Sequence, residues 1–170
     1  MPLERLWAGW RSDYLTSVTD APADDADTTT CVFCRILASD EADDATYVLW
    51  RGERCFAILN AYPYASGHLL VMPYRHVGDL EDLAADEATE LWGAVRTATV
   101  ALKAAYRPDG LNVGANLGRA AGAGVPGHLH LHVLPRWGGD TNFVTSVAEA
   151  RVLPEALPST YERLRAAWPG

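Results

Sequence analysis

Three of the chain's five histidines fall within five residues, in the run His128-Leu129-His130-Leu131-His132. Alternate side chains of a β-strand share a face, so a strand here presents three imidazoles on one side and the leucines on the other. An imidazole titrates near neutral pH, and when one ring nitrogen donates to a backbone carbonyl the other offers its lone pair. The run therefore predicts a nucleophilic histidine, the alternative being a polar sheet face without chemistry.

A glycine-rich stretch, residues 118–127, lies directly before these histidines. Glycine lets backbone N–H groups approach an anion closely. The stretch and the histidines together indicate attack of an imidazole on a phosphorus atom. Taken alone, such a stretch is equally typical of an ordinary connection between two strands.

A second group of residues has the composition of a metal site. Cys31 and Cys34 have the spacing of a metal-binding or redox pair. With His76 and His128 they would supply the four ligands of a closed, structural zinc site. Zinc would then tie the strand of His128 to the N-terminal segment and leave catalysis to His130. The alternative is two small buried cysteines and a surface histidine.

The elements that must carry these groups follow from the spacing of apolar residues. Strands are predicted at residues 46–50, 55–60, 68–73, 111–117 and 128–135. A long helix that covers one side of a sheet is predicted from Asp86 to Tyr106 by the apolar stripe Leu91, Val95, Ala98, Leu102 and Ala105. Pro108 and Gly110 end it. Helices are also predicted at residues 1–15 and 158–168, so the fold class is α+β, with an antiparallel sheet of about five strands.

Length and composition predict one domain over residues 1–170. Residues 1–15 form its N-terminal helix, 16–30 a mobile linker, 31–137 the core and 138–170 a C-terminal extension. The net charge of -8 argues against binding of nucleic acid. No apolar run reaches the length of a membrane span, and three cysteines do not suggest a disulfide framework. We therefore expect a cytoplasmic protein.

The run from His128 to Pro135 resembles the defining motif of the histidine triad family of nucleotide hydrolases and transferases. Residues 57–60, 67–73 and 112–118 resemble substrate-side segments of that family, so the resemblance spans roughly residues 31–137. Residues 5–7, 59–64 and 135–143 are similar to its actinobacterial branch of diadenosine tetraphosphate phosphorylases. The cysteine and histidine set is also similar to a zinc site of some family members.

The resemblance implies a histidine triad fold and a role for individual residues. His130 would attack the α-phosphorus and form a nucleotidyl-histidine intermediate, while His132 would hydrogen-bond a phosphate oxygen. The implied substrate-binding residues are Asn60 at the ribose, Asn116 at the phosphates, and the backbone of Gly122, Ala123, Gly124 and Val125 along the phosphate chain. The implied partners are diadenosine tetraphosphate, inorganic phosphate as acceptor, and a second copy of the chain in a homodimer.

Two other functions use the same residues. One is a dinucleotide hydrolase or nucleoside phosphoramidase with water as acceptor, and the other is a nucleotide-binding module without turnover. A uridylyltransferase is disfavoured, because that group has Gln where this chain has His132. The family's hydrolases often carry Gln or Ser just before the triad, where this chain has only residues 124–127, Gly-Val-Pro-Gly. His68, at the start of a predicted strand, is interpreted as a packing residue.

Overall fold

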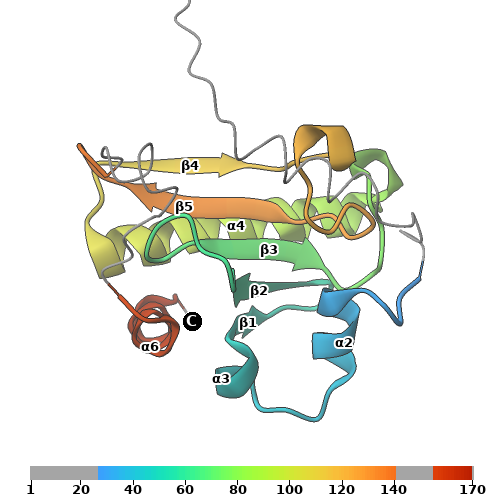
Figure 1. Cartoon of the computed structure of the whole chain (residues 1–170), viewed down its shortest axis with the longest axis horizontal. Helices are drawn as coiled ribbons and strands as arrows, with labels where there is room; N and C mark the ends of the chain where they lie inside the picture. Colours follow the sequence, from blue (N-terminus) through green and yellow to red (C-terminus); the bar gives the residue numbers. More distant parts are fainter. Residues whose placement is uncertain (1–26, 141–154, 170) are drawn as a thin grey trace, which may run out of the picture.

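The computed structural model describes residues 27–140 and 155–169. In chain order, the elements are α2 (Val32–Ala38), α3 (Asp43–Thr46), β1 (Val48–Arg51), β2 (Cys55–Leu59), β3 (Leu69–Pro73), the 3-10 helix η1 (Leu80–Asp82), α4 (Ala85–Tyr106), β4 (Gly110–Gly114), the 3-10 helix η2 (Arg119–Ala121), β5 (Leu131–Arg136) and α6 (Leu157–Ala167). The expected α+β fold with a five-stranded antiparallel sheet is confirmed (Figure 1).

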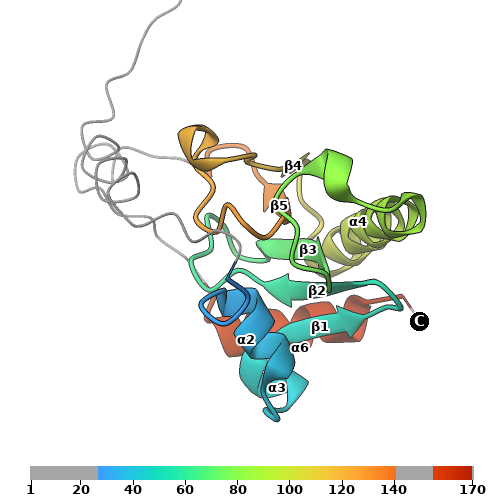
Figure 2. The same ribbon diagram turned by 90° about the vertical axis from the view of Figure 1, so that its right-hand side faces the viewer.

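The sheet has the strand order β1-β2-β3-β5-β4, and each neighbouring pair is antiparallel. The crossover places β5, which carries the end of the histidine run, between β3 and β4. In β5, His132 stands opposite Leu70 of β3 and Gly114 of β4. Figures 1 and 2 show α4 along one face of this sheet and α2 on the other side.

Side chains alternate between the two faces of each strand, so the sheet has a separate hydrophobic core on each face. In β2, Cys55, Ala57 and Leu59 belong to the core that α4 and α6 complete. Phe56 and Ile58 belong instead to a core that includes Phe33 of α2. Both faces of the central strands are therefore buried, which explains why β2 and β3 are apolar throughout.

The predicted apolar stripe is the face of helix α4 that packs in the core. Leu91, Val95, Ala98 and Leu102 are buried in the core, and Ala105 packs against it. The helix ends where Arg107 adopts a left-handed conformation with φ 47 and donates its N–H to the carbonyl of Lys103 at 3.1 Å. Pro108 follows and cannot continue the helical hydrogen bonding.

The ends of the chain are only partly described. The predicted helix at residues 158–168 is confirmed as α6, with Pro158 in its first turn. The predicted helix at residues 1–15 lies outside the described residues. The linker at 16–30 stays a prediction, since only its last four residues are described, as a turn. Within the described ranges, no helix is both long and apolar enough to cross a membrane.

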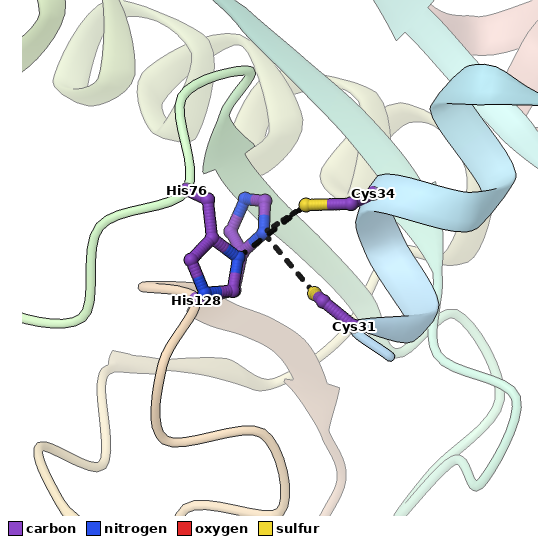
Figure 3. Close-up of side chains that lie close together, drawn as sticks. All are labelled: Cys31, Cys34, His76 and His128. Carbon is purple, nitrogen blue, oxygen red and sulfur yellow. Dashed lines mark hydrogen bonds between the residues drawn. The ribbon is translucent and has the colours of Figure 1, made fainter. Parts of the chain in front are cut away.

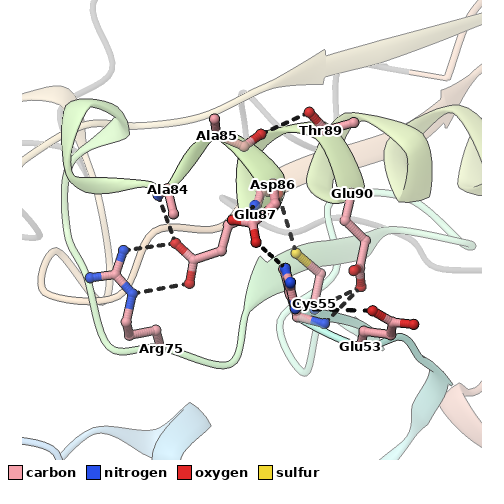
Figure 4. Close-up of polar contacts among 10 residues, drawn as sticks. Glu53, Cys55, Arg75, Ala84, Ala85, Asp86, Glu87, Thr89 and Glu90 are labelled. Carbon is pink, nitrogen blue, oxygen red and sulfur yellow. Dashed lines mark hydrogen bonds and ion pairs between the residues drawn. The ribbon is translucent and has the colours of Figure 1, made fainter.

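A buried carboxylate attaches the segment after β3 to the start of α4. Glu87 accepts hydrogen bonds from the Arg75 guanidinium at 3.0 and 2.7 Å and from the N–H of Ala84 at 2.8 Å (Figure 4). The bonds from Arg75 lower the pKa of Glu87 to about 2. This pairing fixes the segment in which His76 directly follows Arg75.

We expect Glu87→Gln to lower the free energy of unfolding by about 2 kcal/mol at pH 7, because a charge-assisted pair is lost. The folded pKa of Glu87 lies below its ordinary value of 4.5, so the ionised side chain stabilises the fold fully above that pH. This stabilisation is lost as the pH falls from 4.5 towards 2. Urea unfolding at pH 7 and pH 3 should therefore show a difference from wild type that shrinks at the lower pH. The exposed Glu81→Gln is the matched control, and an unchanged difference at pH 3 would contradict the assignment.

Candidate active site

The histidine run enters the sheet later than predicted. Strand β5 begins at Leu131, so a strand beginning at His128 is wrong, and His128 and His130 lie in the segment that leads into β5. The reason is a hydrogen bond to a segment distant in the sequence, because the N–H of Leu129 donates to the carbonyl of Val77 at 2.6 Å rather than to β3. The alternation of faces survives, since Leu129 and Leu131 both point into the α4 core.

His130 is held in one chemical form by a backbone contact. Its Nδ1 lies 2.7 Å from the carbonyl oxygen of His128, and because a carbonyl can only accept, Nδ1 carries the proton. The neutral ring then has its lone pair on Nε2. Burial lowers the pKa of His130, which favours this neutral form at pH 7. The ring of Phe33 packs against His130, with the ring centroids 5.4 Å apart.

His132 lies beside His130 and contacts a residue that was not expected at this site. The ring centroids of His130 and His132 are 5.1 Å apart. His132 Nδ1 is 2.9 Å from Nε2 of His68, a residue that the sequence suggested was for packing only. His68 is 1% exposed and belongs to the histidine cluster, two residues before Leu70, the partner of His132 across the sheet.

The predicted substrate-side asparagines both lie at the ends of strands. Asn60 follows β2, and its side chain contacts the N–H of Tyr62 at 3.0 Å and Nδ1 of His68 at 3.3 Å. Asn116 follows β4 and donates to the carbonyl of Gly122 at 3.4 Å, which ties it to the glycine-rich loop. Asn60 is thus connected to the histidine cluster, while Asn116 shapes the loop.

The glycine-rich loop is partly closed on itself. Gly122 has φ +91 and donates its N–H to Arg119, and Ala123 donates to Gly118. Among the described residues, the N–H groups of Gly124 and Val125 have no hydrogen-bond partner. Of the four residues expected to lie along the phosphate chain, Gly124 and Val125 are therefore the two whose backbone N–H groups could bind phosphate oxygens.

The four predicted metal ligands converge from three parts of the chain. The cysteines come from the start of α2, His76 from the segment after β3, and His128 from the segment before β5 (Figure 3). His128 Nδ1 is 3.5 Å from the sulfur of Cys31 and 3.6 Å from that of Cys34, and His76 Nδ1 is 3.3 Å from Cys34. A tetrahedral zinc ion places sulfur and nitrogen ligands about 3.6 Å apart. The donor set and its spacing therefore fit zinc.

His128 links this cluster to His130. Its Nε2 donates to the carbonyl of Pro73 at 2.9 Å, which leaves Nδ1 with the lone pair that faces the cysteines. Burial lowers the pKa of His128 to about 4, so the ring is neutral, as a ligand must be. The backbone carbonyl of the same residue holds His130. One residue thus serves both sites.

Sequence reasoning missed two contributors to this region. Phe33 lies between the two cysteines, and its ring is 5.4 Å from both His128 and His130. Tyr64 donates its backbone N–H to His68 at 3.1 Å and places its ring 4.6 Å from that imidazole. The signal for Phe33 was its position inside the Cys31-x-x-Cys34 pair; nothing in the sequence pointed to Tyr64 as a backbone donor.

Comparison with known proteins agrees with this geometry. A family model described as the HIT domain matches residues 41–139. An AP-4-A phosphorylase from Mycobacterium tuberculosis is 40% identical over 168 residues, which cover 98% of this chain and 85% of that protein. A bifunctional bis(5'-adenosyl)-triphosphatase/adenylylsulfatase from Arabidopsis thaliana is 35% identical over 57% of this chain and 53% of its own length.

Two solved structures extend the comparison to the fold. A zinc-bound histidine triad family protein from Mycobacterium smegmatis superimposes with a TM-score of 0.67 at 30% identity, covering 83% of this chain and 94% of its own. A hypothetical histidine triad nucleotide-binding protein from Sulfolobus tokodaii gives a TM-score of 0.66 at 31% identity, covering 81% and 91%. With the family model matching more than half of its length, the chain belongs to the HIT domain family of histidine triad proteins.

Proposed function

We propose that this protein cleaves dinucleoside polyphosphates, with diadenosine tetraphosphate as substrate and inorganic phosphate as acceptor. The observation that carries the proposal is the bond from His130 Nδ1 to the carbonyl of His128, which leaves the lone pair of the neutral ring on Nε2, where it can act as a nucleophile. The similarity to an AP-4-A phosphorylase over nearly the whole chain supports this choice of substrate.

The reaction has two displacements at one phosphorus atom. Nε2 of His130 bonds to the α-phosphorus, the bond from that phosphorus to the bridging oxygen breaks, and ATP leaves with the electron pair. The carbonyl of His128 stabilises the positive charge that the ring gains in the nucleotidyl-histidine. Phosphate then attacks the same phosphorus, releases His130 and forms ADP. Dividing one difficult displacement into two lowers each barrier.

The other predicted residues surround this path. His132 would hydrogen-bond a phosphate oxygen through a ring nitrogen, and burial, which lowers its pKa to about 4, favours its neutral form. Asn60 would meet the ribose and Asn116 would hold the phosphates. The N–H groups of Gly124 and Val125 would bind phosphate oxygens.

The deciding assay is incubation of the full chain with diadenosine tetraphosphate, with and without phosphate. We expect ADP and ATP in the presence of phosphate and little turnover in its absence. AMP and ATP at the same rate under both conditions would identify water as the acceptor. Tight nucleotide binding without turnover would indicate a binding module instead.

A hydrolase is the second candidate function. The segment from Gly124 to Gly127 has no side chain that could donate a proton to the leaving nucleotide. This segment therefore does not favour phosphate over water as the acceptor. The similarity to the Arabidopsis triphosphatase, although it covers just over half of this chain, favours the same alternative. A nucleoside phosphoramidase would also use His130 and water.

We further propose that Cys31, Cys34, His76 and His128 bind one structural zinc ion. The zinc-bound relative from Mycobacterium smegmatis and the ligand spacing support it. Bound zinc would neutralise the thiolates and tie α2 to the segment of His128, with no coordination position left for substrate. We propose the cytoplasm as the location, because the site needs reduced cysteines.

We also infer that two copies of the chain pair along β4. This strand is at the edge of the sheet, and its residues Asn112, Val113 and Gly114 are exposed. An edge strand offers unpaired N–H and carbonyl groups to a second strand. A homodimer joined there would continue the sheet from one copy into the other.

A further inference from the structure

The histidine cluster contains a residue that the proposed reaction does not use. His68 is 1% exposed, lies outside the triad, and contacts His132 through its Nε2 at 2.9 Å. A buried imidazole with both nitrogens engaged has a definite proton position, which its neighbours determine.

Two donors point at Nδ1 of His68. The backbone N–H of Tyr64 lies 3.1 Å from it, and a backbone N–H can only donate. The side-chain nitrogen of Asn60 lies 3.3 Å from the same atom. The orientation of that amide is determined because its oxygen accepts the N–H of Tyr62 at 3.0 Å. Nδ1 of His68 therefore carries no proton, and Nε2 must carry it.

The proton position of His68 determines that of His132. Nε2–H of His68 donates to Nδ1 of His132, which must then be an acceptor. In the neutral ring of His132 the proton is therefore on Nε2. Among the described residues, this Nε2 is a buried atom without a hydrogen-bond partner. It is a donor whose own partner must come from a ligand.

We propose that His68 is a positioning residue that fixes His132 as an N–H donor to a non-bridging oxygen of the phosphoryl group under attack. This inference rests on the proposed function for the identity of the ligand, but the tautomer of His132 follows from contacts within the chain. A fixed donor next to the nucleophile stabilises charge that develops on the phosphoryl oxygens. The hydrogen bonds from the N–H of Tyr64 to His68 and from His68 to His132 form a relay. Because this relay begins at the backbone of Tyr64, the turn after β2 determines the hydrogen bonding of His132.

Two substitutions separate this role from simple packing. In His68→Gln, the amide nitrogen can occupy the place of Nε2 and still donate to His132. In His68→Asn, the shorter amide reproduces Nδ1, so it can accept from Tyr64 but cannot reach His132. A role confined to holding the turn predicts that Asn is the better replacement. The relay predicts the opposite order.

The test measures steady-state kinetics with diadenosine tetraphosphate and phosphate. We expect His68→Asn to lower kcat by at least about tenfold with KM within about threefold of wild type, as for loss of an orienting partner. His68→Gln should retain kcat within about threefold. Equal losses in both variants, no loss in either, or a larger loss in Gln than in Asn would overturn the proposal.

A second measurement does not depend on turnover. Nitrogen NMR of histidine-labelled wild type, with the signals of His132 assigned from their absence in His132→Gln, distinguishes protonated from unprotonated ring nitrogens. We expect a protonated Nε2 and an unprotonated Nδ1 in His132 of the free protein. The reverse assignment would overturn the relay even if the enzyme is active. An inactive wild type with the expected tautomer would instead count against the proposed function alone.

Discussion

His130→Asn is expected to abolish the nucleotidyl adduct and to lower kcat by about 10⁴-fold or more, since the group that forms the covalent bond is lost. Asparagine is the informative replacement, because its amide nitrogen can still donate to the carbonyl of His128 where Nδ1 does. The variant therefore keeps the local backbone contact and removes only Nε2, the atom proposed to attack phosphorus. Mass spectrometry of protein quenched during turnover measures the adduct, and product analysis measures kcat.

His132→Gln is the matched comparison for that variant. Its loss should be smaller, about 10²-fold in kcat, because a hydrogen bond to a phosphate oxygen disappears while the nucleophile remains. The adduct should still form in His132→Gln, although more slowly. An adduct of undiminished amount in His130→Asn, or an adduct lost only in His132→Gln, would assign the nucleophile to another residue.

The fold could be predicted because the central strands are short apolar runs and the long helix has a strong apolar period. The stripe from Leu91 to Leu102 predicted α4, and it is the part of the helix buried against the sheet. Strand boundaries were less predictable, because hydrogen bonds to distant segments decide them. The N–H of Leu129 bonds to Val77, 52 residues earlier in the chain by numbering, and this contact moves the start of β5 past His130.

The candidate site was predictable to the extent that its residues are close in sequence or have a recognisable spacing. The cysteine pair and the histidine run are such signals, and their side chains do meet. The role of His68 was not predictable, because it depends on the register in which Leu70 of β3 lies opposite His132. That register places His68, two residues before Leu70, on the face of the triad.

Loss of the proposed zinc ion is expected to have the largest effect on stability. The full chain purified without added zinc should contain about one zinc ion, and Cys34→Ser should contain almost none. A ligand present at a thousand times its Kd stabilises the folded state by about 4 kcal/mol, so we expect Cys34→Ser to lower the free energy of unfolding by at least that amount. Elemental analysis and urea unfolding measure the two quantities.

Cys55→Ala is the control for this experiment. Cys55 is fully buried in the α4 core, whereas Cys31 belongs to the core on the other face of the sheet, and the sulfur of Cys55 lies 3.7 Å from the carbonyl of Glu87. Removal of this sulfur leaves a small cavity and should lower the free energy of unfolding by about 1 kcal/mol, while the zinc content stays the same. Equal zinc content in wild type and Cys34→Ser, or no zinc in either, would remove the metal from this site.

The same variant tests whether the metal site supports catalysis through His128. In Cys34→Ser the proposed zinc ion and the sulfur that lies 3.6 Å from Nδ1 of His128 are both absent, so the ring of His128 is held less firmly. The carbonyl of His128 would then be less firmly placed beneath His130. We expect adduct formation in Cys34→Ser to slow by about tenfold under conditions in which the variant is still folded. An unchanged rate in the folded, zinc-free variant would mean that the contact of Phe33 with His130 and the bond of His128 to Pro73 suffice to orient the nucleophile.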